Sequence, residues 1–136
     1  MLVHSILKYT IAMTVWESGR ESALLDEIIA GRKTIEGRLN RSKFAEYKPG
    51  DMVWLRRDHR DDQGVLHEGD PRQVLVEVLA IRRYRNSLEM VTAEGYERVM
   101  PSARSAEEAA AGYNLYYSDE DQATYGVLAI EFRVLQ

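Results

Sequence analysis

Three side chains that can handle protons or phosphate lie close together at Lys33, Glu36 and Arg38. On a strand, alternate side chains share a face, so Thr34, Glu36 and Arg38 would point the same way and Ile35 the other. Lys33 then belongs to the preceding loop, from which its ammonium reaches over the Glu36 face. A carboxylate between two cations can bind a phosphate or transfer a proton. The competing interpretation is a solvated Glu36–Arg38 ion pair, worth about 0–1 kcal/mol.

The elements that position these residues are a helix and a strand separated by a glycine. Apolar residues recur at helical spacing in residues 21–30, which predicts a short amphipathic helix. Gly31 follows it, and glycine typically ends a helix because it adopts the left-handed conformation without a Cβ penalty. Thr34 and Ile35 are β-branched and favour an extended chain. The predicted order is therefore helix, glycine stop, then the strand that carries Glu36.

Strand and helix patterns fill the remainder of the chain. Alternation predicts further strands over 9–16, 52–57, 73–84 and 125–135, and helices over 87–93 and 106–116, the last capped by Ser105. Ser18-Gly19 is expected to be a turn, and the polar residues 59–70 a long hairpin loop. Five strands with two or three short helices predict a small α+β barrel. We expect one domain that spans residues 1–136.

The segment from Gly31 to Arg38 fits the pattern G-x-K-x-x-E-x-R, and the turn of residues 48–51 leads into Met-Val-Trp-Leu at 52–55. With these motifs and the later strands near 76–84 and 125–132, the chain resembles the ASCH domain, a relative of the PUA-like RNA-binding barrels. The resemblance extends over about residues 9–135. It implies a PUA-like β-barrel with RNA or a nucleoside as ligand.

Composition excludes several kinds of chemistry. The chain contains no cysteine, which rules out disulfides, thiolate catalysis and cysteine zinc sites. His4, His59 and His67 are scattered, so we expect neither a metal nor another cofactor. No apolar stretch approaches the ~20 residues of a membrane helix, and the N-terminus does not resemble a signal peptide. We therefore expect a cytoplasmic protein without a membrane partner.

Charge is distributed unevenly along the chain, whose formal net charge is −4. Residues 32–60 contain nine basic and four acidic side chains, whereas residues 86–136 contain three basic and nine acidic ones. This asymmetry predicts one basic and one acidic face. The alternative is that the charges interleave in space.

The first functional hypothesis is recognition of single-stranded RNA or a modified nucleoside. Glu36 would accept a hydrogen bond from a base amino group or a ribose hydroxyl, while the cations hold phosphate. Tyrosines would stack on bases or donate their hydroxyls, although core packing is the alternative for each. The expected binding residues are Lys33, Thr34, Glu36, Arg38, Arg41, Tyr84, Tyr116 and Tyr117.

The second hypothesis is a hydrolase with Lys33 and Glu36 as catalytic residues. Some small ASCH proteins are amidohydrolases that act on acetylated cytidine, and the resemblance implies that their catalytic lysine matches Lys33. Their nucleophilic threonine, three residues later, is replaced here by Glu36, and Glu97 is the candidate for their downstream acid. A Lys–Glu pair could still perform acid–base work, and a ribonuclease could use Arg38 to hold phosphate.

The third hypothesis is a protein-interaction module, because ASCH domains also occur in a transcription cointegrator. The acidic C-terminal half and the polar residues 58–70 would then be partner surfaces. The sequence does not specify the oligomeric state.

Overall fold

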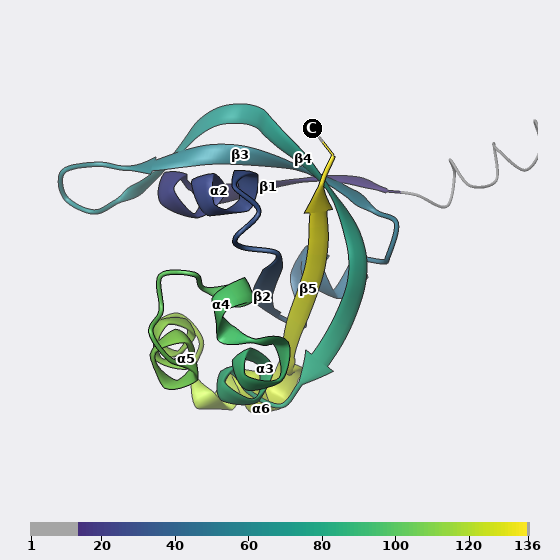
Figure 1. Cartoon of the computed structure of the whole chain (residues 1–136), viewed down its shortest axis with the longest axis vertical. Helices are drawn as coiled ribbons and strands as arrows, with labels where there is room; N and C mark the ends of the chain where they lie inside the picture. Colours follow the sequence, from purple (N-terminus) through teal and green to yellow (C-terminus); the bar gives the residue numbers. More distant parts are fainter. Residues whose placement is uncertain (1–13, 136) are drawn as a thin grey trace, which may run out of the picture.

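A curled, open sheet of five strands is the frame of the computed structural model, which describes residues 14–135 (Figure 1). The strand order is β1-β3-β4-β5-β2; β1 runs parallel to β3, and the other neighbouring pairs are antiparallel. Strands β1 and β2 are therefore the two edges and share no backbone ladder. The predicted α+β barrel is confirmed. The strands are β1 (Val15–Glu21), β2 (Ile35–Leu39), β3 (Met52–Arg60), β4 (Leu66–Tyr84) and β5 (Val127–Val134).

Short helices cover the sheet, and the described residues contain more of them than the two or three predicted. Asn86, Ser105 and Ser118 cap three of them by accepting hydrogen bonds from backbone amides in the first turn. The helices that were not predicted, Tyr96–Val99 and Asp119–Tyr125, have only four and seven residues, so they leave little periodic pattern in the sequence. The helices are α2 (Ser22–Ile29), α3 (Ser87–Glu94), α4 (Tyr96–Val99), α5 (Ala106–Asn114) and α6 (Asp119–Tyr125), with a 3₁₀ helix η1 (Ser42–Glu46).

Two apolar cores lie on opposite sides of the β2–β5 pair. The inner core fills the curl of the sheet, where Leu25 and Ile28 of α2 pack against β3, β4 and β5. The second core lies between the outer face of β2 and β5 and the cluster of α3, α4 and α5 (Figure 1). It includes Ile35 and Leu39 from β2 together with Val99 from α4. One face of strand β2 is thus covered by the second core, which fixes the direction of the side chains on both of its faces.

Two local predictions were wrong, and tertiary pairing is the reason in both. Strand β1 includes Ser18 and Gly19, predicted as a turn, because its parallel pairing with β3 holds them extended. Of the strand predicted over residues 9–16, positions 9–13 lie outside the described residues. The predicted loop 59–70 is mostly a continuation of β3 and β4, and the turn between Arg60 and Leu66 contains Gly64 at a φ of +80°.

Candidate functional site

A cleft of about 400 Å³ opens where the two edge strands approach one another. It is lined by β1, β2, α2, α4, the end of α5 and the β3–β4 hairpin. No backbone ladder joins β1 to β2 there. Instead, Arg20 on β1 and Glu36 on β2 form an ion pair across the seam, with 2.5 Å between Nε and Oε2. The charged residues of the cleft therefore occupy the place where the barrel is left open.

Strand β2 positions its side chains by strict alternation. Ile35 and Leu39 enter the second core, while Glu36 and Arg38 point to the other side and line the cleft. Gly37 lies between them against the helices. A Cβ there would approach the Met90 and Tyr113 side chains to 2.7–2.9 Å, so the close packing of α5 on β2 requires glycine. The Tyr113 hydroxyl accepts a hydrogen bond from the Gly37 amide at 3.3 Å.

Lys33 lies in the loop before β2, as predicted, and is only 2% exposed. Its Nζ donates to the backbone carbonyls of Ile35 at 2.9 Å and Val99 at 2.6 Å, and lies 3.8 Å from Oε1 of Glu36. Burial lowers the pKa of Lys33, although Glu36 opposes this effect. The lysine therefore joins α4 to β2 and places an ammonium in the cleft.

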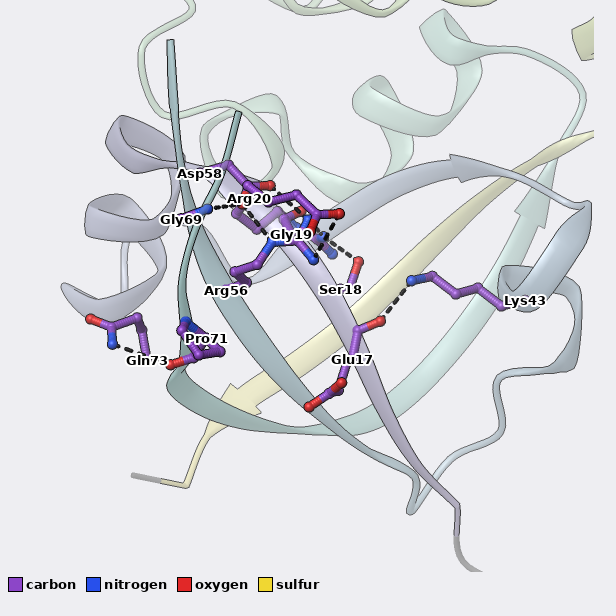
Figure 2. Close-up of polar contacts among 11 residues, drawn as sticks. Glu17, Ser18, Gly19, Arg20, Lys43, Arg56, Asp58, Gly69, Pro71 and Gln73 are labelled. Atoms are coloured by element: carbon purple, nitrogen blue, oxygen red, sulfur yellow. Dashed lines mark hydrogen bonds and ion pairs between the residues drawn. The ribbon is translucent and has the colours of Figure 1, made fainter. Parts of the chain in front are cut away.

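Arg20 is the residue of this cluster that sequence reasoning missed. Its Nη1 donates to the Ser18 hydroxyl and the Gly19 carbonyl, both at 2.7 Å, which aims the guanidinium along β1 toward the seam (Figure 2). Lys43 of η1 also reaches β1, where it donates to the Glu17 carbonyl at 2.7 Å. The only sequence signal for Arg20 is its alternation with Ser18, and the apparent Ser-Gly turn conceals that signal.

Arg38 is the least constrained cation of the cluster. Its guanidinium lies over the Phe44 ring, 4.7 Å from the centroid, in a cation–π contact. Its Nε is 4.0 Å from Oε1 of Glu36 and has no hydrogen-bond partner among residues 14–135. Because the Arg38 side chain is still 26% exposed and its ion pair with Glu36 is long, the solvent-facing part of its guanidinium can turn to a ligand at little cost.

The charges of the cleft do not balance. Arg20, Lys33 and Arg38 surround one carboxylate, Glu36, which is 6% exposed. Burial alone would raise the pKa of Glu36, but the three cations outweigh it and lower the pKa to about 2. Glu36 is thus ionised at neutral pH, and with Lys33 protonated the cluster has two excess positive charges. A buried excess of positive charge favours an anionic ligand.

The mouth of the cleft is aromatic and apolar. Tyr116, which is 73% exposed, and Leu66 from the hairpin both line it. Tyr117 also lines it and stacks on Tyr113, with ring centroids 6.4 Å apart and planes at 13°. A planar ring entering the cleft would meet these side chains before its charged groups reached the cations. This arrangement suits a ligand that is aromatic at one end and anionic at the other.

The structure brings five of the predicted site residues into the cleft: Lys33, Glu36, Arg38, Tyr116 and Tyr117. Thr34 does not line it, and its hydroxyl instead accepts a hydrogen bond from Arg98 Nε at 3.4 Å. Arg41 lies in an adjacent hollow. Tyr84 lies in a separate hollow and donates its hydroxyl hydrogen bond to Glu94.

Two other expectations concern acidic and metal-binding groups. Glu97, the candidate for a downstream catalytic acid, does not line the cleft. Among the described residues no group of three His, Asp or Glu side chains could hold a metal ion.

The basic surplus of residues 32–60 is largely paired with acids from elsewhere. Arg57 meets Asp26 at 3.0 Å and Arg60 meets Glu21 at 2.9 Å. Charges at these positions therefore interleave, as the alternative interpretation held. The cleft therefore differs from these surfaces, because its positive charges outnumber the negative ones.

Comparisons with known proteins agree with this architecture. The chain is 34% identical to protein PH0355; the match covers 90% of this chain and all of that one, with a TM-score of 0.74. It is 35% identical to protein PF0455 from Pyrococcus furiosus; that match covers 90% of this chain and 99% of the other, with a TM-score of 0.70. An ASCH domain from Lactobacillus crispatus JV V101 shares the fold at 12% identity, over 89% of this chain and 79% of that one, with a TM-score of 0.52.

No curated protein sequence matches the chain at a significant level. Within residues 14–135 no helix is long and apolar enough to cross a membrane. The family model of the ASCH domain matches residues 22–136, which include the whole cleft except the end of β1. The chain therefore belongs to the ASCH domain family.

Proposed function

We propose that the cleft binds RNA or a modified nucleoside. The observation that carries this proposal is the cluster of three cations, two of them buried, around one buried carboxylate. Two excess positive charges in a site this enclosed are costly unless an anion enters. RNA supplies phosphates for the cations and bases for the aromatic mouth.

Each cleft residue has a role that its position suits. Arg38 binds phosphate, because its side chain is partly exposed, its ion pair with Glu36 is 4.0 Å long, and a guanidinium matches the geometry of phosphate oxygens. Lys33 and Arg20 supply positive potential from fixed positions, since both already donate to protein acceptors. Glu36, an acceptor at neutral pH, receives a base amino group or a ribose hydroxyl. Tyr116 stacks on the base at the mouth.

The test is binding of labelled single-stranded RNA, followed by fluorescence anisotropy over a range of salt concentrations. Replacing Arg38 by Gln should weaken binding at least tenfold and reduce the salt slope by about 0.7, the value for one lost phosphate contact on a single strand. Arg38→Glu should weaken binding further. An Arg85→Gln variant is the matched control, because Arg85 is 89% exposed and lies outside the cleft. Unchanged affinity and salt slope in both Arg38 variants would rule out the proposal.

Hydrolysis of RNA or acylated nucleosides is the second candidate, favoured by the lowered pKa of Lys33 beside Glu36. A buried lysine of lowered pKa can exchange protons nearer neutrality. The test incubates the protein with acetylated and unmodified nucleosides and short RNAs, and follows products by mass spectrometry. Turnover that disappears in a folded Lys33→Met variant would make the protein an enzyme. Intact ligand recovered with the wild type would leave a binding module.

A further inference from the structure

We infer that the ligand is a strand of at least two nucleotides, with the second one in a hollow beside the cleft. The inference rests on the proposed function and extends it from a nucleoside to an oligonucleotide. The hollow has a volume of about 280 Å³. Arg38 and Tyr117 line both cavities and form the wall between them. The hollow's other lining residues are Leu39, Arg41, Ser42 and Phe44.

Arg38 is placed for the phosphate that joins the two nucleotides. It lines both cavities, and its side chain is 26% exposed. Phe44 holds the guanidinium from one side by the cation–π contact. A phosphodiester crossing this wall would receive charge-assisted hydrogen bonds from the exposed part of a guanidinium whose ion pair with Glu36 is 4.0 Å long. A free nucleoside lacks this phosphate, and a mononucleotide would leave the second hollow empty.

Arg41 provides a second cation for the strand as it leaves the cleft. Its side chain is 44% exposed, and its guanidinium lies 3.6 Å from Asp121 and 5.4 Å from the centre of the Tyr125 ring. On the opposite side of the cleft, Arg60 is held more tightly, by Glu21 at 2.9 Å and by the Gly64 carbonyl at 2.7 Å. Because Arg41 has looser contacts than Arg60, it can turn to a phosphate more easily. We therefore expect the RNA strand to leave the cleft over Arg38 and Arg41 rather than along the β3–β4 hairpin.

Ser42 adds an independent local observation. It adopts a left-handed backbone at a φ of +55°, one of two such non-glycine residues in the described part of the chain. Strained backbone of this kind persists where the surrounding structure imposes it and gathers at binding sites. Ser42 is exposed, begins η1 and lines the hollow. Its hydroxyl and amide therefore add polar groups beside Arg41 for the sugar–phosphate backbone.

The experiment compares mononucleotides with dinucleotides by isothermal titration calorimetry. The probes are 5′-phosphorylated ribonucleotides, pN and pNpN, with each of the four bases. In the wild type, the second nucleotide should raise affinity at least tenfold for the preferred base. Arg41→Gln should remove most of that gain and leave mononucleotide affinity within twofold, whereas Phe44→Leu, which also releases Arg38, should remove the gain and weaken mononucleotide binding as well. Arg85→Gln is the control for charge, because Arg85 pairs with Glu89 outside both cavities.

The outcomes separate this inference from the proposed function. Equal affinity for pN and pNpN in the wild type would overturn the inference and leave the cleft as a mononucleotide site. A gain that survives Arg41→Gln and Phe44→Leu but disappears in Arg60→Gln would place the strand along the hairpin and also overturn it. Failure of every probe and of longer RNA to bind would overturn the proposed function as well. Circular dichroism checks whether Phe44→Leu still folds. Arg41→Gln changes an exposed side chain, so its result does not depend on the packing of Phe44.

Discussion

Two ion-pair clusters lie near β2 and β5 and differ in charge balance. The cleft cluster consists of Arg20, Lys33, Arg38 and Glu36, three cations around one anion. The outer network has two cations and two anions. Within it both Glu94 oxygens accept from Arg82 at 2.6 Å, and Glu131 accepts from Arg82 at 2.8 Å and from Arg98 at 3.1 Å. The members of the outer network are Arg82, Glu94, Arg98 and Glu131, together with the Tyr84 hydroxyl.

The difference separates a network that its own partners satisfy from a cluster left with an excess of positive charge. In the outer network the carboxylates are satisfied by protein donors, so it needs nothing from outside. In the cleft cluster Arg20 Nε and Glu36 Oε2 are buried and pair only with each other, whereas Arg38 Nε is buried without a hydrogen-bond partner among the described residues. Such groups are costly unless something else satisfies them. The outer network also supports the cleft, because Arg98 immediately precedes Val99, whose carbonyl holds Lys33.

The largest expected effect comes from Glu36→Gln, which removes the anion of the cleft cluster. Two buried cations and the partly exposed Arg38 would then face one another, and we expect a loss of about 3–5 kcal/mol in the free energy of unfolding. Inorganic phosphate should restore part of the loss, since it binds the folded state alone. Urea denaturation in phosphate and in chloride at equal ionic strength measures both effects.

Glu94→Gln is the matched control from the outer network. It should also destabilise the protein, because Arg82 loses a buried partner, but phosphate should not rescue it. Equal rescue of the two variants would contradict the distinction between a balanced and an unbalanced cluster.

The next effect is on acid stability. The pKa of Glu36 is about 2 in the folded protein, against an ordinary value of 4.5. Its contribution is therefore fully present above about pH 4.5 and is lost as the pH falls toward 2. The difference between the two pKa values corresponds to about 3 kcal/mol. Unfolding measured between pH 6 and 2 should show this loss in the wild type and in Glu94→Gln, and a shallower profile in Glu36→Gln. Parallel profiles for all three proteins would contradict it.

Local sequence was enough to place part of the site. Lys33, Glu36 and Arg38 meet because a glycine stop and a strand's alternation fix their directions over a few residues. Arg20 and Tyr113 reach the same cleft through the parallel pairing of β1 and the docking of α5 on Gly37. Those contacts join distant parts of the chain, and no local pattern encodes them.

The same limit applies to the fold. Alternation predicts the sheet-forming segments after residue 50, but it does not give their order in the sheet, in which β4 is the middle strand. Tyr84 was assigned to the binding site by residue type, yet its register opposite Val127 carries it to the hollow beside α3 and α6. The register of a strand is set by its pairing in the assembled sheet. The residue types near the end of a strand therefore do not predict which cavity a side chain such as Tyr84 will line.

The smallest expected effect on stability comes from Arg82→Gln in the outer network. Together with Arg38→Gln in the cleft cluster it gives the sharpest comparison, because each substitution removes one positive charge from one cluster. Arg82→Gln should cost about 1 kcal/mol of stability, a modest value because the Arg82 side chain is 37% exposed and solvent screens its pairs. It should leave RNA affinity within twofold, whereas Arg38→Gln should lower affinity at least tenfold with little loss of stability. Chemical denaturation and RNA titration of both variants test whether Arg82→Gln lowers mainly the stability and Arg38→Gln mainly the RNA affinity. If Arg82→Gln weakened binding as much as Arg38→Gln, general loss of charge rather than a defined cleft would explain recognition.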